Sequence, residues 1–102
     1  MSIGVSADEL VTVAKGWSAK KQIMGQDVYN DKSEKVGVLD DLIIAQDKAV
    51  SCAIIGTGGF LGVDKHDVAI PVNQLKMEEG KITLPGATKD AVKAMPTFQY
   101  PK

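Results

Sequence analysis

In this chain of 102 residues, His66 and the carboxylates near it are the first candidates for a chemical role. Asp64 and Asp67 flank this histidine, and the acidic pair Asp40-Asp41 could approach it in the fold. Imidazole and carboxylate groups are ligands of zinc and of hard divalent cations. His66 and Asp67 are nevertheless consecutive in a pattern typical of a β-strand, so their side chains point to opposite faces. We therefore expect a polar strand end here and no metal site.

Cys52 and His66 are a second pair to consider, as a thiol nucleophile with its base. Cys52 lies in a nearly all-apolar run, where a thiol normally behaves as a small buried hydrophobic side chain. As the single cysteine, it cannot form an internal disulfide. Neighbouring carboxylates such as Glu78-Glu79 diverge on a strand and do not form a glycosidase pair. The sequence therefore predicts no catalytic residue, no bound cofactor and a protein that is not an enzyme.

A glycine-rich connection at 56–62, with Phe60 and Leu61 at its tip, invites comparison with a nucleotide-binding loop. Leu61 stands where the dinucleotide-binding fingerprint requires its last glycine, and a strand rather than a helix follows. We interpret the connection as a wide turn with positive φ angles. Phe60 and Leu61 then either fold back to close one end of the domain or project as an apolar contact for a partner.

Composition and charge exclude several classes of protein. Hydrophobic residues make up 44% and charged residues 25%, the balance of one soluble globular domain. The net charge of -1 lacks the basic excess of a nucleic-acid-binding protein. No apolar run approaches the ~20 residues of a membrane-spanning helix. The first residues show no export signal, although a chain trimmed of such a signal would read the same.

The hydrophobic pattern begins with a short helix, predicted over residues 6–15. Ser6 and Glu9 have the spacing of a capping box, and Gly16 supplies a stop. Trp17 follows at once. We interpret Trp17 as an anchor that holds this helix to the body of the domain.

Short β-strands account for most of the remaining chain. They are predicted at 25–29, 35–46, 50–56 and 66–72, with a hairpin of 75–78 and 81–84 around Glu79-Gly80. Asp40-Asp41 interrupts the alternation of the second strand and indicates a bend or a bulge. The run 50–56 is apolar enough for a central strand. Thr88 begins a last helix, predicted to end at Met95, and an extended tail follows. This pattern favours a small antiparallel barrel or sandwich.

Four segments, taken in order, also carry a family resemblance. They read GQDVYN at 25–30, EKVGVLDDLII at 34–44, GTGGFLG at 56–62 and HDVAIPV at 66–72. Together they resemble the PRC-barrel family, which includes the H subunit of the photosynthetic reaction centre and the C-terminal domain of the ribosome maturation factor RimM. The match runs from about Lys21 to Leu84. The flanking segments look like those of small stand-alone bacterial members.

The resemblance implies a mainly β fold, a small antiparallel PRC-type β-barrel of about five or six strands with short N-terminal and C-terminal helices. Residues 1–20 would be the N-terminal helix and its anchor, 21–86 the barrel, and 87–102 the C-terminal helix and tail of a single domain. The family has no common reaction, so the resemblance implies an interaction module. Many stand-alone members are exported, which favours a periplasmic over a cytoplasmic location.

Apolar side chains in excess of what so small a barrel can enclose lead to the main functional hypothesis. We expect a protein-interaction surface, used in a homo-oligomer or with another protein partner, that draws on five residues: Trp17, Phe60, Leu61, Phe98 and Tyr100. Phe98 and Tyr100 either lie across the domain's own surface or reach a second subunit.

Two alternative functions remain open from the sequence. One is a small-ligand or metal-binding domain, with a pocket at the barrel mouth near Phe60 and His66. The other is a factor for RNA binding or ribosome assembly, by analogy with RimM alone. The mild acidity and the lack of basic clustering weigh against the second alternative, so no nucleic-acid partner is expected.

Overall fold

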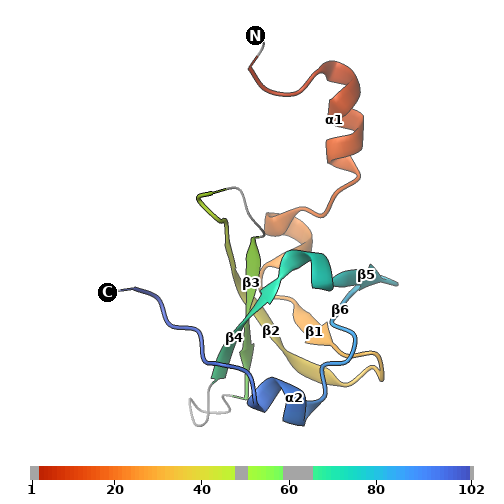
Figure 1. Ribbon diagram of the computed structural model, residues 1–102. Helices are drawn as coiled ribbons and strands as arrows, with labels where there is room; N and C mark the ends of the chain where they lie inside the picture. The colour runs from red at the N-terminus through yellow and green to blue at the C-terminus, as the bar shows by residue number, and fades with distance from the viewer. Residues whose placement is uncertain (1–2, 48–50, 59–65, 102) are drawn as a thin grey trace.

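The computed structural model describes residues 3–47, 51–58 and 66–101, and their elements are labelled in Figure 1. Six strands in this part of the chain form one sheet in the order β4-β3-β2-β1-β6-β5. The strands are β1 (Asp27–Tyr29), β2 (Lys35–Ile43), β3 (Cys52–Thr57), β4 (His66–Pro71), β5 (Lys76–Glu78) and β6 (Lys81–Thr83). The helical segments are α1 (Ala7–Ala14), the π-helical turn η1 (Ala19–Ile23), the 3₁₀ turn η3 (Val72–Gln74) and α2 (Lys89–Lys93).

The sheet is mixed and open, which corrects the predicted antiparallel barrel. Four of its five strand pairs are antiparallel, but β1 and β6 are parallel, with Val28 opposite Ile82. The hairpin turn after β5 reverses the chain, so β6 reaches β1 in the same direction as β1. β4 and β5 are the two edges, and within the described residues no pairing joins them. The prediction of a mainly β fold with short helices is confirmed.

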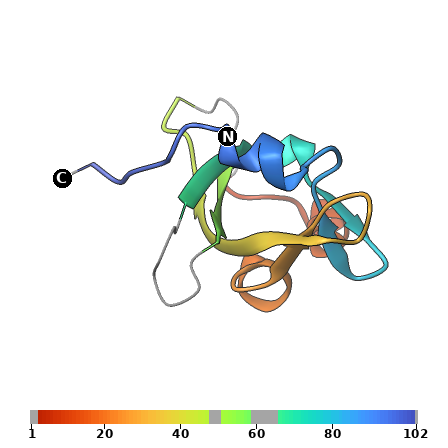
Figure 2. The ribbon, with the colours of Figure 1, turned by 90° about the horizontal axis from the view of Figure 1, so that it is seen from below.

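The long strand β2 gives the sheet its curvature, which Figure 2 shows from below. Its first half pairs with β1 and its second half with β3. The register with β3 shifts between Leu39 and Asp41, so the predicted bulge at this position is confirmed. Gly37 allows β2 and β3 to approach closely, because a Cβ there would lie 2.5 Å from the carbonyl oxygen of Gly56. A bulge bends and twists a strand, and this one turns β2 from one neighbour to the other.

The core lies inside this curve and is made of aliphatic side chains. Its most deeply buried members are Val28, Leu39, Ile55, Val68 and Ile70. On β3, Ile54 and Ile55 point to opposite faces and each is 1% exposed, so this strand is buried on both faces. The prediction that β3 is a central strand is therefore confirmed.

Turns and caps follow the predicted residue chemistry. Glu79 and Gly80 both have positive φ, 50° and 76°, as the two-residue turn of the β5–β6 hairpin requires. Thr88 caps α2 by accepting a hydrogen bond from the Ala91 amide.

Asn30 is 3% exposed, and its side-chain amide donates to the carbonyl of Ala87, 3.1 Å away. The β1–β2 turn is thereby tied to the C-terminal segment.

Helix α1 departs from the prediction in its packing. Its capping box is formed, since the Ser6 hydroxyl accepts from the Glu9 amide and the Glu9 carboxylate accepts from the Ser6 amide. The hydrogen bond from the Ser6 amide holds the pKa of Glu9 below its usual range. However, α1 has no buried residue and stands clear of the sheet (Figure 1). α1 therefore does not pack on the sheet, and the interpretation of Trp17 as an anchor that holds this helix to the body stays a prediction.

Stability is expected to depend on the buried side chain at the bend of β2. Leu39→Ala removes a fully buried side chain and should lower the free energy of unfolding by about 2–5 kcal/mol. Gln99→Ala is the control, because Gln99 is exposed on the tail, outside the hollow, and its truncation should change stability by less than about 0.5 kcal/mol. Urea unfolding of both variants measures the difference, and equal small effects would contradict this description of the core.

Candidate functional site

An apolar hollow of about 450 Å³ opens at the end of the sheet where β3 begins and β4 ends. Aliphatic side chains and Trp17 make up most of its lining, which consists of Gly16, Trp17, Ala19, Ile23, Leu39, Leu42, Ile44, Ser51, Val72, Leu75 and Ile82. His66 lies at the other end of the β3–β4 ladder, opposite Thr57. The pocket is therefore not near His66, where the small-ligand hypothesis placed it, and Phe60 lies outside the described residues.

The turn η1 holds Trp17 at the hollow. The Ser18 hydroxyl accepts from the Lys21 amide at 3.1 Å, and the Ser18 amide donates to the Gln22 side chain at 2.8 Å. These bonds close the start of η1 directly after Trp17, and Ile23 at the other end of the turn is buried. The Trp17 side chain is 38% exposed, because one part faces the hollow and the rest faces solvent.

Exposed apolar side chains continue from the hollow into the segment that precedes it. We call residues 3–15 the N-terminal arm; it includes α1 and extends away from the sheet (Figure 1). Its exposed apolar residues are Ile3, Val5, Leu10, Val11 and Val13, with exposed fractions between 48% and 102%. Scattered exposed aliphatic residues are ordinary, but here five lie within one short segment next to an apolar hollow.

The C-terminal tail, residues 96–101, lies on the domain's own surface. The Phe98 amide donates to the Asp67 carbonyl at 2.7 Å, on the open edge of β4. The Tyr100 hydroxyl donates to the Asp41 carboxylate at 2.6 Å, and the rings of Phe98 and Tyr100 meet edge to face at 5.0 Å. Because Asp67 and Asp41 lie on strands either side of β3, the tail crosses the outer face of β3, where Ile54 is buried.

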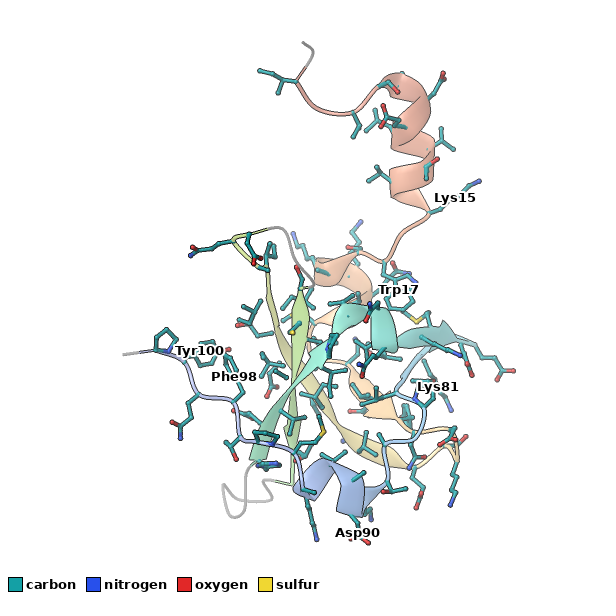
Figure 3. The ribbon with its side chains drawn as sticks, in the orientation of Figure 1. Lys15, Trp17, Lys81, Asp90, Phe98 and Tyr100 are labelled. Atoms are coloured by element: carbon teal, nitrogen blue, oxygen red, sulfur yellow. The ribbon has the colours of Figure 1, made fainter. Side chains whose placement is uncertain are left out.

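The predicted interface residues therefore do not gather in one place. Figure 3 shows Trp17 on the body, below the arm, and Phe98 and Tyr100 together on the tail, away from Trp17. Phe98 and Tyr100 contact Asp67 and Asp41 of their own chain, as one of the two alternatives left open by the sequence expects. Phe60 and Leu61 lie outside the described residues.

Side chains proposed for chemistry are also kept apart. Cys52 pairs with Pro71 and His66 with Thr57, at opposite ends of the β3–β4 ladder. Cys52 is half-buried rather than buried as predicted, because it begins its strand at the open end of the sheet. The His66 ring lies 2.8 Å from the Thr97 hydroxyl. Among the described residues, which exclude Asp64, no group of three His, Cys, Asp or Glu side chains could hold a metal ion.

Comparison with protein families decides the classification of this chain. Residues 19–90 match the family model of the PRC-barrel domain, a match that takes in the whole sheet, η1 and the start of α2. The chain belongs to the PRC-barrel family. A comparison with curated proteins gave no match. In the part of the chain that the structure describes, no helix has both the length and the apolar character needed to cross a bilayer.

The hollow of this PRC-barrel domain escaped prediction because its lining comes from distant segments. Trp17, Ile44 and Leu75 belong to three different connections, and only the curvature of the sheet brings them together. The exposure of the apolar residues in the N-terminal arm was easier to predict from the sequence. The aliphatic residues at 3, 5, 10 and 13 precede the family match, so they had no barrel interior in which to be buried.

The hydrogen bond between Tyr100 and Asp41 should make the stability of this PRC-barrel domain depend on pH. The hydrogen bond to Asp41 raises the pKa of Tyr100, with smaller effects from burial and from the charges of Asp41, Asp67 and Asp40. A raised pKa means that the contact stabilises the fold below the ordinary value of 10.0 and is lost as the pH rises through the folded value. Asp41→Asn should therefore lower the pKa of Tyr100 toward 10.0.

Phenolate absorbance in a Tyr29→Phe background measures this pKa, since Tyr100 is then the single tyrosine. Asp31→Asn is the matched control, because that carboxylate contacts the Gly86 amide instead. Identical titration curves for the Asp41→Asn variant and its parent would show that Tyr100 does not bond to Asp41 in solution.

Proposed function

We propose that this PRC-barrel domain is a non-catalytic interaction module that associates with a second copy of itself through the surface around Trp17. The observation that carries the proposal is helix α1, which has eight residues and buries none of them. Isolated helices of this length are marginal in water, and most helices gain stability by packing an apolar face. A capping box alone adds only about 1 kcal/mol, so a stable α1 needs a covered face.

The hollow supports the same proposal from the body of the domain. It is almost wholly apolar, and the arm joins the body at its rim through Gly16 and Trp17. Exposed apolar surface of this kind is costly in water and is typical of contact sites between proteins. The separation of Cys52 from His66 supports a function by contact rather than by catalysis.

The proposal changes which residues we assign to the interface. Trp17 keeps its predicted role, and the arm side chains Leu10 and Val13 join it. Phe98 and Tyr100 leave the set, because their partners are Asp67 and Asp41 of their own chain. Phe60 and Leu61 remain a prediction.

Self-association should be visible as a mass that rises with protein concentration. Trp17→Ser should weaken it by at least about tenfold, since aromatic anchors in interfaces commonly contribute more than 1 kcal/mol. Tyr100→Phe is the control; it removes the tail hydroxyl that donates to Asp41 of the same chain and should leave the association unchanged. Sedimentation equilibrium measures both. A wild-type chain that stays monomeric up to millimolar concentration would refute the proposal.

A small apolar ligand in the hollow is the second candidate function. The volume of about 450 Å³ lies in the usual range of ligand pockets, and Ser51 offers one hydroxyl among apolar groups. A medium-chain fatty acid should then raise the melting temperature and shift the fluorescence of Trp17, the single tryptophan. Leu75→Glu, which places a carboxylate in the lining, should abolish both effects. The absence of any shift in the wild-type chain would exclude this class of ligand.

A further inference from the structure

We infer that helix α1 of one copy lies in the hollow of a second copy, and that the second copy returns the same contact. This inference rests on the self-association proposed above and identifies the two surfaces that meet. The arm side chains are exposed in the single chain, the hollow has Trp17 and Ile44 exposed on its wall, and both surfaces are apolar.

The apolar surfaces match in chemistry. On α1, Leu10, Val11 and Val13 are 55%, 60% and 60% exposed, which leaves branched aliphatic groups for a partner. In the hollow, Ile44 is 80% exposed beside Leu42 and Leu75, with no charged side chain in the lining. A short amphipathic helix laid in an apolar groove is a recurrent mode of recognition between proteins.

Charges on both sides favour one orientation. The first turn of α1 carries Asp8 and Glu9. The turn η1, whose residues Ala19 and Ile23 line the hollow, carries the exposed Lys20 and Lys21. Among the described residues neither lysine has an ion-pair partner within its own chain. The acidic end of an arriving α1 would therefore lie against the basic η1 of its partner, and such complementarity sets register and partner choice.

The joint between α1 and the body explains why the occupant is a second copy. The Gly16 amide donates to the Val13 carbonyl at 3.0 Å and extends the end of α1. Ser18 already caps η1, so only Trp17 lies between the two hydrogen-bonded turns. A joint this short leaves mainly the backbone torsions of Trp17 to change the direction of the arm. As Figure 3 shows, the arm points away from Trp17 and the sheet, where a second molecule can receive it.

Reciprocal exchange of the N-terminal arms also gives a closed dimer. Each copy carries both the arm and the hollow, so a twofold arrangement covers the arm and the hollow of both copies at once. A closed dimer leaves neither surface free to recruit a third copy. Exchange of an element through a short joint is a common route to such dimers.

Full-length variants test the contact on the arm side. Leu10→Asp should raise the dimer dissociation constant by at least about tenfold, because it puts a charge in an apolar contact. Thr12→Asp is the matched control; it adds the same charge two residues away, on the opposite side of α1. A Leu10→Asp chain that dimerises as the wild type does would overturn the arm exchange while leaving self-association intact. A wild-type chain that never dimerises would remove both proposals.

Disulfide trapping tests which hollow the arm occupies. In a Cys52→Ala background, Leu10→Cys and Ile44→Cys chains are purified separately, mixed and oxidised. We expect a covalent dimer between the two variants, and little from Leu10→Cys mixed with Lys93→Cys, whose thiol lies on α2 away from the hollow. A chain that carries both Leu10→Cys and Ile44→Cys and closes a disulfide within a monomer would overturn the inference, since the arm would then occupy its own hollow.

Discussion

The double pairing of β2 is the constraint on which the rest of this domain depends. One strand of nine residues pairs with β1 through its first half and with β3 through its second, and the bulge after Leu39 turns it between them. Hydrogen bonding along both halves keeps the backbone satisfied while the sheet bends around Leu39 and its neighbours. Because the sheet curls without closing in the described residues, an interior forms under its centre and an apolar hollow remains at one end.

The N-terminal and C-terminal segments differ in how much of this sheet they cover. The C-terminal tail covers the open edge of β4 and the outer face of β3, through Phe98 and Tyr100, as edge strands generally require some protection. The N-terminal arm covers nothing in its own chain and adds further apolar surface beside the hollow. The tail thus covers part of the sheet within a single copy, whereas the apolar side chains of the arm stay exposed in the single chain.

Sequence patterns predicted best where the physics is local. The Ser6 and Glu9 cap, the Glu79-Gly80 turn and the bulge at Asp40 each involve residues a few positions apart, so their chemistry can be read without the fold. The positions of the aromatic side chains in the fold could not be predicted from such local patterns. Trp17 and Tyr100 looked alike as surplus apolar side chains, yet one lines the hollow and the other bonds to Asp41, more than fifty residues away.

The sequence by itself determined the strands, their turns, both helix caps and the PRC-barrel family, because periodicity, capping and turn chemistry act within short stretches of chain. Only the tertiary structure decided that β6 joins β1 in parallel, that the tail returns to its own surface, and that α1 stays uncovered beside a hollow. Those outcomes depend on where distant segments meet. That meeting is set by the curvature of β2, a property of the assembled sheet that no single segment encodes.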